Sequence, residues 1–273
     1  MRLSRLIAAL IALAVAGSCG AEPEEELTWE EFQALAWQEP ETGVYIANGD
    51  EMFEDIDALR DFYDEWRGER IGSEMVGSIE QGLAINRVGG ADDRWTSSQA
   101  LNLTYCISQP GFGGNYNTMV NAMNSAGGAW EGAARVNFIH RAQFDGNCLG
   151  ANSSQVVFRV LRTSGQSYLA RAFFPSSSWS NQTVVVDQSS FGNISPWTLT
   201  GILRHELGHT LGFRHEHTRP EAGTCFENNS WRGLTTYDSA SVMHYPQCNG
   251  SQGGDLVLTT RDRQGAASVY GSP

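Results

Sequence analysis

After residue 100, apolar and polar residues alternate in several short segments, and this pattern predicts β-strands. Two other segments show apolar residues at helical spacing: Tyr116–Ala133 and the stretch that begins at Thr198 or Thr200. A last helix is expected from about Thr260 to Tyr270. The expected strands are Leu101–Ile107, Val136–His140, Val156–Leu161, Tyr168–Phe174 and Thr183–Asp187.

The N-terminal part of the chain has a different pattern. Two arginines, an apolar run from Leu6 to Ala16 and then small residues predict a secretory signal over residues 1–19. This run is short for a membrane span, and no other apolar stretch is long enough to cross a bilayer. Farther along, Asp50–Arg67 shows helical spacing, so a helix is expected there.

Acidic residues are concentrated before Trp95, where 21 of the 31 occur, all from Glu22 onward. From Trp95 to the end, 10 acidic residues stand against 11 arginines, so the formal net charge of −13 belongs to the N-terminal third. Residues 20–94 are therefore expected to be an acidic segment separate from a domain at 95–273. The chain has no basic cluster, so no nucleic-acid partner is expected.

The candidate chemistry lies in residues 205–217, HELGHTLGFRHEH. His205 and His209 are four residues apart, so on a helix they lie on one face, one turn apart, where both imidazoles can reach the same metal ion. Glu206 lies beside the first histidine, where a carboxylate can take a proton from metal-bound water.

His215 can join these two histidines only if the helix ends, because six more helical residues would turn its side chain away from them. Gly212 is the expected end, since glycine readily adopts the left-handed conformation that terminates helices. Three neutral imidazoles leave a fourth metal position open, as catalytic zinc requires. The pattern predicts one catalytic Zn²⁺ bound by His205, His209 and His215, with Glu206 as general base.

The spacing HExxHxxGxxH is the metzincin signature, so the chain resembles the metzincin zinc metallopeptidases. Its continuation through Glu216 and Arg219, with Phe213 inside it, is similar to the astacin family. Pro220-Glu221 departs from the Asp-Arg-Asp run of that family. Bacterial peptidases with a HEIGH-type motif share much of this stretch and are a near rival for the family.

The resemblance implies an α+β metzincin fold. A mixed twisted sheet with two long helices would form an N-terminal subdomain, and a small irregular C-terminal subdomain would end in a helix. Ser241–Tyr245 matches the astacin Met-turn. By resemblance, Met243 would lie below the zinc histidines, and Tyr245 would approach the metal and stabilise the transition state.

Other residues take their expected roles from the same resemblance. One strand, by order Tyr168–Phe174, would edge the cleft and pair with an extended substrate. His217 and His244 are expected to make structural hydrogen bonds and not to bind the metal. Glu216 would hold the new N-terminus of the processed enzyme in a salt bridge.

An inhibitory pro-segment is also implied, because astacin pro-segments carry an aspartate in a Gly-Asp context that ligates the zinc of the latent enzyme. Asn48-Gly49-Asp50 resembles this context, and the pro-segment would span residues 22 to about 94. The other interpretation of Asp50 is an N-cap or turn residue before the helix that follows it. Both interpretations stay open.

Five cysteines are present, and Cys19 ends the signal region in a context, Ala16-Gly17-Ser18-Cys19, that resembles a bacterial lipobox. Lipidation there would give a surface lipoprotein, whereas cleavage after Ala16 would release a secreted protein. In an exported protein the other four cysteines can all pair. We expect Cys106–Cys148 and Cys225–Cys248, which keeps each bridge within one half of the domain; the other two pairings stay open.

These patterns together predict an exported zinc metalloendopeptidase of a bacterium, monomeric and acting on a protein or peptide substrate by Glu206-assisted attack of zinc-bound water. Membrane contact is expected only through lipid at Cys19. Two other functions stay open: a non-catalytic surface lipoprotein that uses the same scaffold for binding, and a zinc hydrolase of a non-peptide bond. The sequence does not determine the substrate preference or the processing site.

Overall fold

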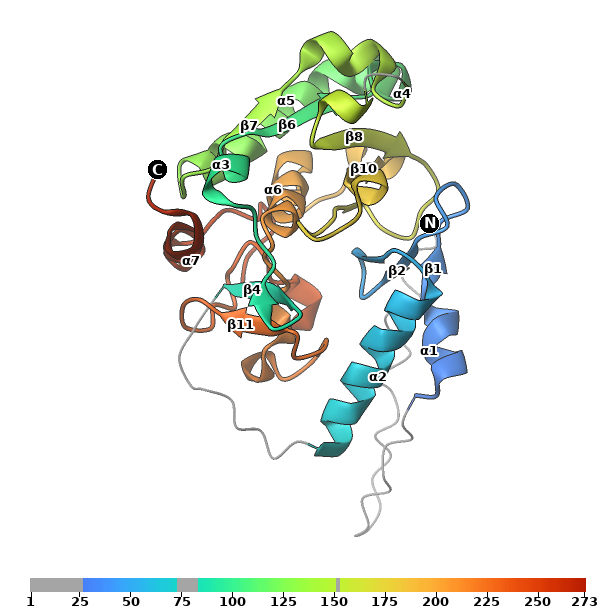
Figure 1. Cartoon of the computed structure of the whole chain (residues 1–273), viewed down its shortest axis with the longest axis vertical. Helices are drawn as coiled ribbons and strands as arrows, with labels where there is room; N and C mark the ends of the chain where they lie inside the picture. Colours follow the sequence, from blue (N-terminus) through green and yellow to red (C-terminus); the bar gives the residue numbers. More distant parts are fainter. Residues whose placement is uncertain (1–26, 73–82, 151–152) are drawn as a thin grey trace.

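The chain folds around two main hydrophobic cores, a larger one in a sheet-and-helix domain and a smaller one in an N-terminal unit. The computed structural model (Figure 1) describes residues 27–72, 83–150 and 153–273. The expected signal at 1–19, Cys19 and the acidic run at 22–26 lie outside the described residues. Within those ranges, no helix has the length and apolar character needed to cross a membrane.

The larger core is built on a five-stranded sheet of β6 (Leu103–Ile107), β7 (Phe138–His140), β8 (Phe158–Thr163), β9 (Ala170–Arg171) and β10 (Thr183–Asp187). The spatial order is β7-β6-β8-β10-β9. All neighbours are parallel except β9, which is antiparallel to β10 and forms one edge. The strand expected at Tyr168–Phe174 is therefore much shorter than predicted, but it does lie at the edge.

Two longer helices accompany this sheet, α5 (Tyr116–Glu131) and α6 (Leu199–Thr210); the short α3 (Ser97–Ala100) precedes β6, and the short α4 (Gln109–Phe112) follows it (Figure 1). Thr198 is the N-cap of α6, because its side chain accepts a hydrogen bond from the Gly201 amide. The predicted α+β class, with a mixed sheet and two long helices before a small C-terminal part, is confirmed.

The C-terminal part is mostly irregular. It contains β11 (Trp231–Gly233) and ends in α7 (Thr260–Tyr270). Thr259 and Asp262 form a capping box at the start of α7. The Asp262 carboxylate also accepts hydrogen bonds from the Ser241 hydroxyl and the Val242 amide, at 2.6 and 3.0 Å. The first turn of the last helix therefore fixes the predicted Met-turn.

Residues 83–94, which the charge pattern grouped with the acidic segment, pack with the main domain. β4 (Ala84–Val88) pairs with β5 (Ala91–Asp92) on one side and with β11 on the other. Leu83 and Ile85 are completely buried in the larger core. The packing boundary of the main domain therefore lies before Leu83.

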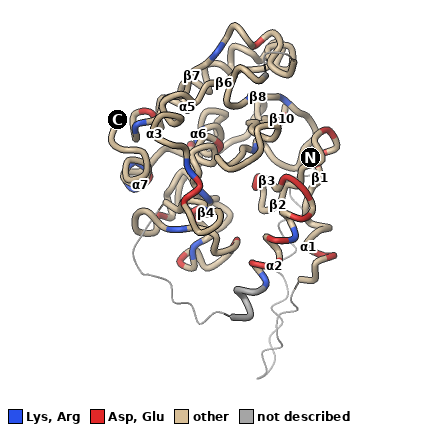
Figure 2. The backbone as a smooth tube through the Cα atoms, in the orientation of Figure 1, with Lys and Arg blue, Asp and Glu red and all other residues tan. Residues whose placement is uncertain are grey.

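The N-terminal unit consists of α1 (Trp29–Leu35), an antiparallel sheet of β1 (Trp37–Gln38), β2 (Tyr45–Ala47) and β3 (Glu51–Phe53), and α2 (Ile56–Gly72). Successive strand residues point in opposite directions. Ile46 and Met52 join the larger core, while their neighbours Ala47 and Phe53 join the smaller one. The small sheet thus lies between the two cores, and Figure 2 shows acidic residues gathered around this unit.

The helix expected over Asp50–Arg67 is wrong in its first turn. Glu51–Phe53 forms β3, and α2 begins only after Asp55, whose carboxylate accepts a hydrogen bond from the Ala58 amide at 2.8 Å. The physical reason is that Met52 and its neighbour Phe53 are buried in different cores, which an extended backbone allows. Asp50 is therefore not the N-cap of this helix.

Gly208 lies where α6, α5 and the Met-turn meet. A methyl group added there would lie 2.3 Å from Met243 Sδ and 3.1 Å from the Trp130 ring.

Gly208→Ala is therefore expected to lower the free energy of unfolding by about 1–3 kcal/mol through overpacking. At Gly128 in α5 an added methyl group meets no atom within 4 Å, so Gly128→Ala should raise stability by about 0.5–1 kcal/mol. Urea unfolding of both variants followed by circular dichroism measures the difference; effects of equal sign would contradict this packing.

Candidate active site

Helix α6 ends in the way that a third histidine ligand requires. Gly212 has a φ of +90°. Its amide donates to the His209 carbonyl at 2.8 Å, and the Phe213 amide donates to the Gly208 carbonyl at 3.0 Å. These two bonds form a Schellman motif, which reverses the chain and brings His215 back to the helix. Any Cβ at Gly212 would clash with the backbone oxygen of Asp93, just after β5, so glycine is required there.

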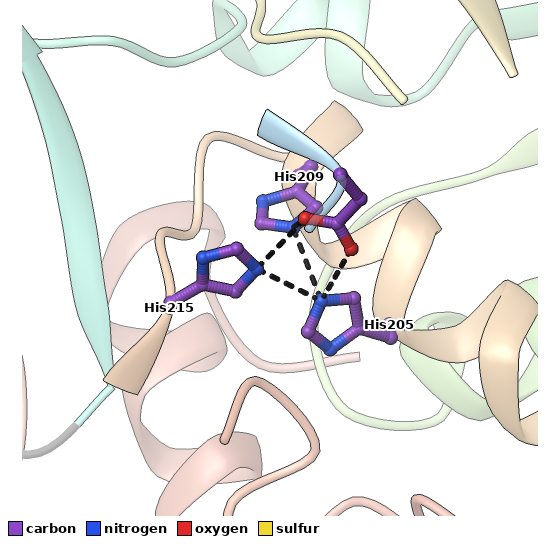
Figure 3. A group of neighbouring side chains, drawn as sticks. His205, His209 and His215 are labelled. Atoms are coloured by element: carbon purple, nitrogen blue, oxygen red, sulfur yellow. Dashed lines mark hydrogen bonds and ion pairs between the residues drawn. The ribbon is translucent and has the colours of Figure 1, made fainter. Parts of the chain in front are cut away.

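The imidazole rings of His205, His209 and His215 point toward one another (Figure 3). Nε2 of His205 lies 3.2 Å from Nε2 of His209 and 3.2 Å from Nε2 of His215. All three side chains are buried. The structure thus brings together the three residues that the sequence predicts as metal ligands.

The outer nitrogens of these rings are already occupied. Nδ1 of His205 and Nδ1 of His209 each lie 2.8 Å from a carbonyl oxygen, those of Val242 and Phe213. A carbonyl only accepts hydrogen bonds, so both Nδ1 atoms carry the proton and both Nε2 atoms can present a lone pair to the centre. Because converging lone pairs repel unless a cation lies between them, this donor set fits a zinc ion.

Asp50 is the fourth side chain of the cluster and comes from the turn between β2 and β3. Its carboxylate oxygens lie 3.3 Å from His205 Nε2, 3.0 Å from His215 Nε2 and 3.9 Å from His209 Nε2. Burial alone would raise the pKa of Asp50, but the charge of His215 and the close contacts with His215 and His205 hold it well below its usual range. These four buried side chains together could hold one metal ion.

Glu206 and Tyr245 flank this cluster. Glu206 is buried, and one of its carboxylate oxygens has no hydrogen-bond partner among the described residues. Burial and the charge of Asp50 raise the pKa of Glu206 well above its usual value. The Tyr245 ring packs against His205 and His215, with ring centroids 5.4 and 4.5 Å apart. Burial, together with the charge of Asp50 and a hydrogen bond to it, raises the pKa of Tyr245.

The remaining motif residues contact the protein itself. Met243 is completely buried with its sulfur against α6, below the helix that carries two of the histidines. His217 faces the Glu227 carboxylate at 3.5 Å, and His244 Nε2 lies 2.8 Å from the Tyr237 hydroxyl. Both histidines thus contact other side chains of the protein, and their purely structural role stays a prediction.

Glu216 is completely buried beside the third histidine. One carboxylate oxygen pairs with Arg219 at 3.0 Å and accepts a hydrogen bond from the Asp238 amide at 3.0 Å. The other oxygen has no partner within the described part of the chain. Burial raises the pKa of Glu216 to about 8, because these partners only partly offset the loss of solvent.

Sequence reasoning missed Glu227, which lies behind the third histidine. Its carboxylate contacts His215 Nδ1 at 2.5 Å and Arg214 at 2.6 Å. Metal-binding histidines commonly donate their second nitrogen to such a carboxylate. Glu227 lies in irregular chain, where no helical or strand spacing connects it to the motif, so only the three-dimensional structure identifies it.

Both expected disulfides, Cys106–Cys148 and Cys225–Cys248, are formed. The second one has a direct bearing on the site. It joins the loop that carries Glu227 to the chain just after the Met-turn and Tyr245. The bridge therefore ties the loop with the Glu227 carboxylate to the segment that carries Tyr245, whose ring packs against the cluster.

Comparison with known proteins finds a protease and tolloid-like proteins among the relatives of this chain, while no family model matches it. Blastula protease 10 of Paracentrotus lividus is 28% identical over 213 residues, which are 71% of this chain and 31% of that protein. Tolloid-like protein 2 of Mus musculus is 36% identical over 92 residues, 26% of this chain and 9% of that protein. The structure of myroilysin has a TM-score of 0.47 at 19% identity, covering 68% of this chain and 98% of that one. The chain spans less than a third of the length of these two curated relatives.

The position of Glu227 predicts that it tunes metal binding without contacting the metal. Glu227→Gln keeps the size of the side chain but removes the charge that faces His215, so zinc affinity should fall about 10- to 100-fold. Competition with a fluorescent zinc chelator measures this change. Glu221→Gln, at an exposed position in the same region, is the control and should keep the affinity of the parent protein. Unchanged affinity in Glu227→Gln would show that the carboxylate does not support the metal site.

Proposed function

Because this chain is an astacin-like metzincin, we propose that it is a zinc-dependent endopeptidase in which His205, His209 and His215 hold the zinc ion. The observation that carries the proposal is the convergence of three buried Nε2 atoms, 3.2 Å apart in two pairs, beside the carboxyl group of Glu206. The activity as a whole is our inference, since the chain matches only part of its relatives.

In this proposal each side chain has one task. Bound zinc supplies a Lewis acid that makes water acidic and polarises the scissile carbonyl. Glu206 accepts a proton from the attacking water and later donates it to the leaving amine. Tyr245 donates its hydroxyl proton in a hydrogen bond to the oxyanion that develops. The packing of the Tyr245 ring against two of the histidines supports this role.

The edge of the sheet provides the binding surface for an extended peptide. β9 lies at the edge of the five-stranded sheet, where a substrate strand can add by main-chain hydrogen bonds. Just beyond it, the Phe174 ring meets His209 edge to face, with centroids 5.5 Å apart. A peptide that pairs with this edge would therefore extend to the cluster of histidines.

The N-terminal unit acts as an inhibitory pro-segment, with Asp50 closing the fourth metal position. Two observations support this role. The Asp50 carboxylate lies within 3.9 Å of all three Nε2 atoms. The neighbouring Glu51 pairs with Arg214 at 3.0 Å, which fixes the turn against the main domain.

Processing before Leu83 fits the packing better than processing near residue 94. A cut near residue 94 would detach β4, which pairs with β11, together with Leu83 and Ile85, which are buried in the larger core. The unpaired oxygen of Glu216 is then the group that would receive the new N-terminal amine.

The protein is proposed to be exported and monomeric. Two disulfide bonds favour an oxidising compartment. Export gives either a secreted bacterial enzyme or a lipoprotein held at the membrane through Cys19.

A non-catalytic binding role is disfavoured by Glu206, because its buried carboxyl group lies beside the histidine cluster, where metal-assisted hydrolysis requires a general base. A zinc hydrolase of a non-peptide bond would use the same residues, so cleavage of casein that is abolished by a chelator and restored by zinc separates the two activities.

The general base provides the sharpest test of the mechanism. Glu206→Ala in the processed enzyme should keep zinc and the fold while kcat/KM for a peptide falls by about 10²–10⁴. Zinc content by atomic emission and near-UV circular dichroism confirm that the site and the fold are intact. Peptide turnover equal to that of the parent enzyme would refute the assignment of the base.

Latency is tested in the unprocessed chain. Asp50→Ala should raise its peptidase activity, because nothing then closes the fourth position. Asp57→Ala is the matched control: Asp57 is an exposed aspartate at the start of α2 and should leave latency unchanged. Cleavage of a quenched fluorescent peptide is measured while mass spectrometry confirms that the chain stays intact. If Asp50→Ala is as inactive as the control, Asp50 is not the inhibitory group.

A further inference from the structure

The N-terminal unit has a hydrophobic core of its own. Among the described residues, every member of this smaller core lies between Leu27 and Trp66, and none comes from the main domain. The Tyr63 hydroxyl of α2 donates to the Leu27 carbonyl at 2.7 Å, which ties α2 to the chain before α1. Aromatic rings fill much of this core, with neighbouring centroids 5.0–6.3 Å apart, and belong to Trp29, Phe32, Phe53, Phe62, Tyr63 and Trp66. The unit is therefore held together mainly by its own side chains.

A buried ion pair joins one end of this unit to the main domain. Glu39, just after β1, pairs with Arg171 of β9 through both carboxylate oxygens, at 2.5 Å to Nε and 2.6 Å to Nη2. The Tyr168 hydroxyl donates to the same carboxylate. Burial would raise the pKa of Glu39, but the hydrogen bond and charge of Arg171 hold it below its usual range. The ionised Glu39 thus fixes the chain after β1 against the edge of the main sheet.

The other end of the unit contacts two loops of the main domain. Glu65, in the second half of α2, accepts hydrogen bonds from the side-chain amide of Asn228 and the hydroxyl of Ser230, both at 2.8 Å. Glu54, just after β3, accepts one from the Ser178 amide at 2.5 Å. Polar contacts therefore hold the unit on both sides of the turn that faces the histidines.

Apolar side chains join the two parts between these polar contacts. Val44, Ile46 and Met52 are 1, 3 and 9% exposed, and all three belong to the larger core of the main domain. Burial of such side chains drives association, whereas buried ion pairs mainly set the geometry, because desolvation offsets most of their attraction. This face of the main domain therefore fits a folded partner that presents apolar residues between carboxylates.

The covalent link between the two parts contributes to none of these contacts. They all come from residues 39–65 of the unit, whereas the link joins the end of α2 at Gly72 to the start of β4 at Ala84. A connection of this kind supplies only an effective concentration, of the order of millimolar when it is short. Because the core of the unit already holds its contact residues in one arrangement, little conformational entropy is lost when the unit binds.

We propose that the N-terminal unit remains bound to the main domain as a separate folded inhibitor when the link is cut, and that activity begins only when the unit dissociates. This rests on the proposed function of the unit as an inhibitory pro-segment. Activation then has two steps, a cut and a separation, and the second step depends on protein concentration by mass action. The face around the histidines is an interaction surface for the unit of the same chain or of another copy.

Dilution of the cut chain tests this proposal. A recognition sequence for an unrelated, site-specific protease is placed in the link of the full chain, which is folded with zinc and then cut. We expect a Kd of about 0.1 µM, so that about 90% of the unit is bound at about 10 µM protein and about 10% at about 10 nM. Specific activity on a quenched fluorescent peptide should therefore rise about tenfold on this dilution. The uncut chain is the control, and its specific activity should not change.

The same cut in Glu206→Ala measures retention without proteolysis. The two parts, each carrying a fluorescent label, should elute together in size-exclusion chromatography at about 10 µM and apart at about 10 nM. Joint elution at both concentrations supports the proposal with a lower Kd. Separate elution at the higher concentration overturns it.

Two variants of the unit connect retention to its structure. Glu65→Ala removes two charge-assisted hydrogen bonds and should raise Kd about tenfold. Leu59→Ala opens a gap in the smaller core, so the loosened unit must be ordered on binding and Kd should also rise about tenfold. Glu30→Ala, at an exposed position of α1, is the matched control and should keep the parent Kd. If Leu59→Ala does not fold, Glu65→Ala and its control still decide the matter.

Failure of retention and failure of the proposed function give different results. Parts that elute together but cleave no peptide at any dilution refute the peptidase and leave the bound unit. Parts that elute together while specific activity is already at its maximum show that the unit does not close the site, which overturns its role as a separate inhibitor. Parts that elute apart at about 10 µM overturn retention, whether or not the main domain is active.

Discussion

Three buried imidazole nitrogens that face one another need a positive charge between them. Several separate parts of the chain hold the three rings in this arrangement. The ring of His205 is oriented by the Val242 carbonyl, and Val242 is itself held by Asp262 at the start of α7. The ring of His209 is oriented by the carbonyl that follows the Schellman turn, and the ring of His215 by Glu227. The end of α6, the Met-turn and the last helix therefore together hold the rings of the three histidines in place.

Three carboxylates from one short stretch of the N-terminal unit contact histidines and arginines of the main domain. Asp50 faces the histidines, Glu51 faces Arg214, and Glu39 faces Arg171. Buried ion pairs add little net stability, because desolvation offsets most of the attraction, but a misplaced pair costs a great deal. These contacts are therefore best understood as fixing the position of Asp50. Burial of Ile46 and Met52 in the larger core supplies the apolar part of the contact.

The sequence predicted the parts of the site that depend on local geometry. Helix periodicity and the need for a break after His209 were enough to predict that three histidines converge and that Gly212 ends the helix, because helix geometry relates residues only a few positions apart. The strand at Glu51–Phe53 was not predicted. Its adjacent apolar residues Met52 and Phe53 are buried in different cores, whereas helical spacing assigns apolar residues to a single buried face. Glu227 and the Glu39–Arg171 pair are separated from their partners by irregular or distant chain, so no periodicity could indicate them.

The positive groups of the main domain explain why the N-terminal unit contacts it through carboxylates. A buried cation without a negative or electron-rich partner is costly. The N-terminal unit supplies such partners through Glu39, which precedes β2 in the chain, and Asp50, which follows it. Two separate charged contacts define the position of the unit on the main domain more narrowly than a contact at the histidines alone.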